Sequence, residues 1–159
     1  MPAANNGAPH SYTGRPMSAD DIDIEDATVR ALFEAASKVR ERAHAPYSGY
    51  RVGAAVLDER GDTWLGCNVE NASYPEGSCA ETAAVAAMIA GGGRRIQHVV
   101  VPGGHDAIAP CSPCGGCRQR ISEFADSATR VWLVGANGAL TSYSVADLLP
   151  AGFSLDNTR

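Results

Sequence analysis

Cysteine is the residue type whose number and spacing first suggest chemistry. The chain has five cysteines, and three of them, Cys111, Cys114 and Cys117, lie in the segment "PCSPCGGCRQ" at residues 110–119. Cys114 and Cys117 are three residues apart, so on the first turn of a helix both thiols point to one side, where the helix dipole favours thiolate. Such a pair suits a tetrahedral zinc site or thioredoxin-like redox chemistry, and the pair alone does not decide between them.

Two other uses of cysteine fit this chain less well. The number of cysteines is odd, and we see no basic and apolar leader, so we expect the reducing cytosol, where thiols bind metal or react. An iron–sulfur run would need a fourth cysteine followed by proline, and "CRQR" offers neither. We expect Cys67 to lie in a strand and to belong to the hydrophobic core, and Cys111 to be a small loop residue.

A third thiol and a carboxylate stand together in "SCAETAAV", where Cys79 begins an alanine-rich helix and Glu81 follows two residues later. The first residue of a helix is not yet helical, so both side chains can converge on one cavity. The alternative is a small buried residue beside a carboxylate that complements the helix dipole. With Cys114 and Cys117, however, three thiolates make an open, catalytic zinc site, in which water is the fourth ligand and an unligated carboxylate moves protons.

The elements that must position these residues follow from hydrophobic spacing. Apolar residues from Val29 to Val39 repeat at helical spacing, and this helix should end before Pro46. We predict further helices over residues 80–90, 113–125 and 145–149, and strands over residues 51–57, 63–67, 96–101, 130–134 and 139–143. This alternation predicts an α/β fold, a three-layer α/β/α sandwich over a five-stranded mixed sheet. Residues 1–22 read as a flexible extension, and residues 23–159 as one domain.

Charge narrows the choice of partner. The net charge is −5 and lysines and arginines form no cluster, which disfavours a protein that grips a nucleic acid backbone. No apolar run is long enough to cross a membrane. We therefore expect a cytoplasmic protein that binds a small molecule.

The motifs together resemble the cytidine deaminases. "SCAETAAV" and "PCSPCGGCRQ" are similar to the C-A-E and P-C-x-x-C zinc signature of that family. "APYSGYRVGAAV" (45–56) and "GCNVENASYPEGSCAE" (66–81) resemble its substrate-binding stretches, and "LLPAGFS" (148–154) resembles its C-terminal segment. The five matches stand in the family's order and at its spacing, from about residue 28 to residue 154.

The resemblance implies a role for each matching position. Cys79, Cys114 and Cys117 would hold one Zn²⁺ per subunit, and Glu81 would move protons between water, ring N3 and the leaving amino group. The substrate contacts it implies are Asn68 and Glu70 to the ribose 3′-hydroxyl, the Ala80 N–H to the base carbonyl, Tyr50 in the wall of the base pocket, and Phe153 stacked on the base. Phe153 would come from a neighbouring subunit, because short members are homotetramers with shared active sites.

Plainer readings exist for several of these residues. Asn68 and Glu70 are by themselves equally typical of a turn, and Tyr50 and Phe153 are by default core aromatics. We interpret Tyr47 and Tyr74 as packing residues.

The implied reaction is hydrolytic deamination of cytidine and 2′-deoxycytidine to uridine and 2′-deoxyuridine. A relative acting on another aminopyrimidine nucleoside, such as the blasticidin-S type, and a non-catalytic zinc-binding module remain as alternatives.

One position departs from the family's pattern. Many tetrameric members have arginine directly after Cys-Ala-Glu, and this chain has Thr82. An arginine there offsets the excess negative charge of three thiolates on one Zn²⁺. Four outcomes are open: Thr82 and the helix dipoles suffice, another arginine reaches the site, the enzyme is slower, or its specificity is shifted. Arg118, next to Cys117, is a candidate for that arginine.

Overall fold

A mixed β-sheet with helices on both faces forms the body of the molecule. The computed structural model describes residues 24, 26–135 and 139–155. Five strands follow the order β2-β1-β3-β5-β6, and the short β4 pairs with β1. The strands are β1 (Arg51–Asp58), β2 (Thr63–Cys67), β3 (Ile96–Val101), β4 (Gly103–Gly104), β5 (Arg130–Val134) and β6 (Leu140–Tyr143). Only β3 and β5 run parallel among these pairs, so the sheet is mixed, as predicted.

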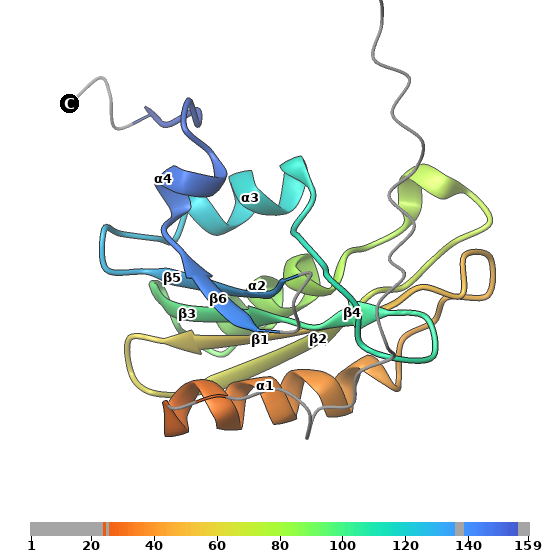
Figure 1. Cartoon of the computed structure of the whole chain (residues 1–159). Coiled ribbons are helices and arrows are strands. Elements are labelled where there is room, and N and C mark those ends of the chain that lie inside the picture. The colour runs from red at the N-terminus through yellow and green to blue at the C-terminus, as the bar shows by residue number, and fades with distance from the viewer. Residues whose placement is uncertain (1–23, 25, 136–138, 156–159) are drawn as a thin grey trace, which may run out of the picture.

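The helices form the outer two layers of a three-layer sandwich (Figure 1). They are α1 (Ala27–Arg40), α2 (Ala80–Ala90), α3 (Gly115–Ser122) and α4 (Val145–Leu148), with a 3-10 turn η2 (Tyr74–Glu76) before α2. One buried cluster lies between the sheet and α1 and contains Phe33 and Val100. The other lies between the sheet and the helices of the opposite face and contains Met88 and Ile121. The α/β sandwich predicted from the sequence is thus confirmed.

Most element bounds agree with the sequence prediction. The bounds of β2, α2, β3 and β5 match exactly, while α3 starts one residue after Cys114 and ends at Ser122 rather than near residue 125. After Ser122 the chain turns toward the sheet, since the Phe124 carbonyl accepts a hydrogen bond from Ile96 N at 2.8 Å. β4 and η2 were not predicted, because two or three residues carry no periodicity. The extension over residues 1–22 lies outside the described part.

A glycine lets α2 lie directly on the sheet. A Cβ on Gly66, in β2, would lie 2.3 Å from Ala80 O and 2.5 Å from Ala84 N. No side chain fits in that space, so the first turn of α2 contacts the strand backbone itself. This contact determines where the residues at the start of α2, Cys79 to Glu81, are placed. Among the described helices, none is both long and apolar enough to span a membrane.

Candidate active site

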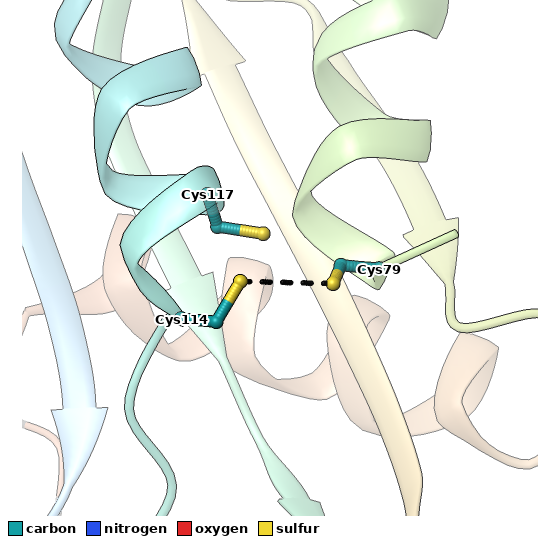
Figure 2. A group of neighbouring side chains, drawn as sticks. All are labelled: Cys79, Cys114 and Cys117. Atoms are coloured by element: carbon teal, nitrogen blue, oxygen red, sulfur yellow. Dashed lines mark hydrogen bonds between the residues drawn. The ribbon is translucent and has the colours of Figure 1, made fainter. Parts of the chain in front are cut away.

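Three thiols from two helix N-termini meet above the sheet. Cys79 is the N-cap of α2, Cys114 is the N-cap of α3, and Cys117 lies in the first turn of α3. Figure 2 shows the three side chains pointing toward one another between these two helices. All three Sγ atoms lie within 4.8 Å of one another, and Cys79 Sγ is 3.9 Å from Cys114 Sγ.

This geometry fits a zinc ion. Tetrahedral zinc with Zn–S bonds of about 2.3 Å places its sulfur ligands about 3.8 Å apart, which is close to the separation of Cys79 and Cys114. All five cysteines are free thiols, so none of the three is tied up in a disulfide. Three sulfur ligands leave one tetrahedral position open, which is the arrangement of catalytic rather than structural zinc.

The thiols differ in how readily they lose a proton. Backbone N–H groups of the first turn of α3 lower the pKa of the Cys114 thiol, as expected for a helix N-terminus. Burial raises the pKa of Cys79 and that of Cys117, and for Cys117 the negative charge of Glu81 adds to it. The expectation that the helix dipole lowers the pKa therefore holds for Cys114 and is wrong for Cys117, where desolvation outweighs it.

Glu81 is the carboxylate that faces the thiols. Glu81 is only 5% exposed, and it lies close enough to Cys117 for its negative charge to raise the pKa of that thiol. Because Cys79 is still extended at the helix start, Glu81 and Cys79 line one cavity although they are two residues apart. A buried carboxylate that lies beside three thiol ligands, but is not itself a ligand, can exchange protons with a group bound among them.

A cavity of about 680 Å³ opens over this centre and is called here the substrate cavity. It brings together residues that are far apart in the sequence. Its lining residues include Tyr47, Tyr50, Asn68, Glu70, Tyr74, Cys79, Ala80, Glu81, Cys111 and Cys114. Ala80 is the first residue of α2, so its N–H has no partner within the helix and remains available at the cavity floor.

Asn68 and Glu70 organise the backbone beside the cavity. The Asn68 side-chain oxygen accepts from Val52 N at 2.8 Å, and its amide nitrogen donates to Tyr50 O at 2.9 Å. The Glu70 carboxylate accepts from Tyr47 N at 2.9 Å, and from Ser48 N at 3.2 Å and Ser48 Oγ at 2.5 Å. These bonds, led by the one from the Ser48 hydroxyl, lower the pKa of Glu70. Neither residue is itself in a turn: both flank Val69, which bridges to His44 and Ser78, and their side chains bind the backbone of residues 47, 48, 50 and 52.

Tyr50 stands in the cavity wall beside Cys111, which we expected to be a small loop residue. The Tyr50 ring and the Cys111 thiol both lie over Gly103, where a Cβ would be 3.2 Å from Tyr50 Cε1 and 2.6 Å from Cys111 Sγ. Burial raises the pKa of Tyr50, and it raises the pKa of Cys111 to about 11. Both groups are thus neutral at physiological pH. Cys111, the first cysteine of the "PCSPCGGCRQ" segment, is therefore a neutral group of the cavity wall, and it lies outside the cluster of three thiols that can hold a metal.

A buried cation supports this wall from behind. Arg40 is 3% exposed, and its Nη2 donates to the carbonyls of Gly104 at 3.0 Å and His105 at 2.6 Å. The His105 ring in turn meets the Tyr50 ring edge-on, with centroids 5.2 Å apart. Arg40 therefore holds the loop that packs against Tyr50. Its periodic position in α1 gave no sign of this role.

Three aromatic residues differ from their simplest expectation. Tyr47 and Tyr74 are 54% and 77% exposed, with ring centroids 6.1 Å apart, so reading them as packing residues is wrong: they line the mouth of the substrate cavity. Phe153 is 72% exposed, does not line the substrate cavity of its own chain, and accepts a hydrogen bond from Gln119 Nε2 on its carbonyl at 2.8 Å. The default reading of Phe153 as a core aromatic is wrong as well.

Arg118 does not turn toward the thiols. Its Nε donates to Pro113 O at 2.9 Å, its Nη1 to Leu148 O at 2.8 Å, and its Nη2 to Ser112 Oγ at 2.8 Å. The guanidinium thus ties α4 to the loop before α3. Arg118 is a structural clamp, and it leaves the charge of the thiol centre to other groups.

Comparison with known proteins agrees with this geometry. A sequence profile described as the cytidine and deoxycytidylate deaminase zinc-binding region matches residues 27–134. A cytidine deaminase of Sporosarcina psychrophila is 40% identical over 129 residues, which cover 81% of this chain and 93% of that protein.

Solved structures give the same result. Cytidine deaminase from Burkholderia pseudomallei aligns with a TM-score of 0.70 at 42% identity, covering 77% of this chain and 97% of the other. The Mycobacterium tuberculosis cytidine deaminase aligns with a TM-score of 0.70 at 34% identity, covering 84% of this chain and 100% of the other. The chain therefore belongs to the cytidine and deoxycytidylate deaminase family, and Cys79, Cys114 and Cys117 form its zinc site.

Proposed function

We propose that this protein hydrolytically deaminates cytidine and 2′-deoxycytidine to uridine and 2′-deoxyuridine, releasing ammonia, in pyrimidine salvage. The observation that carries the proposal is the meeting of three thiols and one unligated carboxylate, Glu81, at the floor of a single cavity. A purely structural zinc site has no use for that carboxylate. The relatives named as cytidine deaminases support the choice of substrate.

Glu81 is the proton carrier in this reaction. Bound zinc supplies the nucleophile, because it lowers the pKa of a water molecule to about 7. Glu81 takes a proton from that water and delivers it to ring N3, which makes C4 of the pyrimidine electrophilic. The water oxygen bonds to C4, and Glu81 then carries the second proton from this oxygen to the amino group. The C4–N bond breaks, which leaves the C4 carbonyl of uridine and releases ammonia. Transfer by a positioned carboxylate is worth about 10² to 10⁴ in rate.

The substrate contacts use the hydrogen-bonding capacity that remains in the cavity. An ionised carboxylate has about four acceptor sites, and backbone and side-chain donors of residues 47 and 48 use three of those on Glu70. The Asn68 amide keeps one lone pair and one N–H, since each end makes one bond to the backbone. We assign the remaining hydrogen-bonding capacity of Asn68 and of Glu70 to the ribose 3′-hydroxyl. The Ala80 N–H binds the base carbonyl, and Tyr50 lines the base pocket.

Phe153 completes the site of another subunit in this proposal. Its exposed ring lies outside the substrate cavity of its own chain, which supports a role in a neighbour's cavity. A largely apolar cavity of about 640 Å³ between α2 and α3, called here the α2–α3 cavity, is consistent with a surface covered by another copy. The protein is then a cytoplasmic homotetramer with shared active sites, acting on a free nucleoside and not on nucleic acid or at a membrane.

Ultraviolet absorbance tests the function directly. Purified protein is incubated with cytidine, 2′-deoxycytidine or free cytosine, with and without a zinc chelator. We expect loss of the nucleosides, slower loss of the base, and no loss after chelation. Zinc-loaded protein that leaves all three unchanged would contradict the proposal and favour another aminopyrimidine nucleoside, such as blasticidin S, or a non-catalytic zinc module.

A further inference from the structure

The zinc centre carries more negative than positive charge. Three thiolates on one Zn²⁺ leave a net charge of −1, and the thiols release their protons when the metal binds. The residue after Glu81 is Thr82, whose hydroxyl oxygen lies 3.9 Å from Cys117 Sγ and carries no charge. Arg118 is taken up by two carbonyls and Ser112. A cation from elsewhere in the fold would offset this charge.

Arg120 lays its guanidinium over Gly116, in the first turn of α3 near Cys114. It follows Cys117 by three residues in α3, so the two share a side of the helix, and long side chains in helices point back toward the N-terminus. The point where a Cβ on Gly116 would lie is 2.8 Å from Arg120 Nη1 and 3.9 Å from Cys114 Sγ. The cation and the thiol therefore converge on the same small space, which Gly116 leaves open.

Arg120 lies outside the substrate cavity. It lines the α2–α3 cavity together with Thr82 and Glu123, and that cavity shares no lining residue with the substrate cavity. Within the described residues its guanidinium makes no ion pair, not even with Glu123. The charge is thus available to the thiols without blocking the nucleoside.

We propose that Arg120 is the positioning residue that balances the charge of the zinc centre. Its positive charge stabilises the thiolate ligands from outside the substrate cavity, and Gly116 keeps the path between them clear. The Thr82 hydroxyl adds a weaker, uncharged contact to Cys117. This inference rests on the zinc site of the proposed enzyme and adds a residue that touches neither metal nor substrate.

Zinc affinity tests the proposal without any nucleoside. Apparent zinc dissociation constants are measured at pH 7.5 by competition with a chromogenic chelator. Outer residues that support metal ligands typically change affinity by about 10- to 100-fold, so we expect Arg120→Gln to weaken zinc binding by at least about tenfold. Arg120→Lys, which keeps the charge, should stay within about threefold of wild type. In zinc-saturated enzyme, Arg120→Gln should lower kcat and leave KM unchanged.

Two further variants separate the position of the Arg120 charge from the net charge of the protein. Gly116→Ala places a methyl group 2.8 Å from Nη1, so it displaces the guanidinium without removing the charge, and should fall between wild type and Arg120→Gln. Arg95→Gln, at an exposed arginine beyond the far end of α2, makes the same change in net charge and should behave as wild type.

Several results would overturn the proposal. These are wild-type zinc affinity in Arg120→Gln, equal losses in the Gln and Lys variants, or an equal loss in Arg95→Gln. Dissociation of the assembly with unchanged zinc affinity would also overturn it, by placing Arg120 in a subunit contact. Because the titration uses no nucleoside, an inactive but zinc-binding wild type would refute the proposed function and leave this inference standing.

Discussion

Replacing Glu81 by glutamine separates proton transfer from metal binding. The residue is 5% exposed and lies against Cys117, and it is not one of the three thiol ligands. Glutamine has nearly the same shape and still hydrogen-bonds, but it cannot accept and return a proton. We therefore expect Glu81→Gln to fold and to hold zinc, while its catalysis is almost lost.

The expected loss follows from the role of the carboxylate. A positioned general acid and base contributes about 10² to 10⁴ in rate. At 1.36 kcal/mol for each factor of ten, this is about 3–5 kcal/mol of transition-state stabilisation. Because Glu81 serves both N3 and the leaving amino group, the loss should lie at the upper end of that range. It should appear in kcat, since the carboxylate has its main effect in the transition state.

The assay pairs turnover with metal content. Cytidine loss is followed by ultraviolet absorbance, zinc per subunit is measured on the same sample, and Glu76→Gln serves as the control because Glu76 is exposed in η2 and does not line the substrate cavity. A Glu81→Gln enzyme within tenfold of wild-type kcat at full zinc content would refute the proton-transfer role. Loss of zinc in this variant would refute the placement of Glu81 outside the metal ligands.

Three other substitutions test the sugar contact, the shared site and the stability of the sheet. Asn68→Ala should reduce kcat/KM for cytidine far more than for free cytosine, whereas equal losses would mean that Asn68 does not recognise the sugar. Phe153→Ala should raise the KM for cytidine about 5- to 100-fold, because stacking on a base is worth about 1–3 kcal/mol. Reassembled mixtures of Phe153→Ala and Glu81→Gln subunits should regain sites with the wild-type KM for cytidine if sites are shared, and a mixture that keeps only the raised KM would contradict sharing. Burial acts to raise the pKa of Asp58, but hydrogen bonds from Trp64, the backbone and Arg60 outweigh it and bring the pKa to about 2. Asp58→Asn should therefore lower the free energy of unfolding by about 2–3 kcal/mol at neutral pH. The difference in melting temperature from wild type should disappear as the pH falls from about 4 toward 2, because only the ionised Asp58 carboxylate stabilises the fold and it becomes protonated over this range.

The residue pattern by itself determined the layers of the fold and the chemical type of the site. The alanine-rich run before Gly91 set both ends of α2, and the valine-rich segment 96–101 set β3, because helix and strand periodicities are local properties. The spacing of Cys114 and Cys117 placed two thiols on one turn. Cys79 with Glu81 added the candidate ligand and base, and the family resemblance assigned their roles.

Only the tertiary structure decided which groups meet. Cys79 is 35 residues from Cys114, and their sulfurs come within 3.9 Å because Gly66 lets α2 lie on β2 while α3 lies beside it. The same packing brought Tyr47, Tyr74 and Cys111 to the substrate cavity, although their sequence surroundings indicated only a loop or a core.

The two arginines of α3 show most clearly what the local sequence cannot predict. Arg118 and Arg120 stand two residues apart in the same helix, yet the first binds the carbonyls of Pro113 and Leu148 and the second lies over Gly116, near Cys114. Local spacing places them on different sides of a helix but does not say what each side faces. What each side faces depends on contacts between residues far apart in the sequence, and these form only when the layers pack.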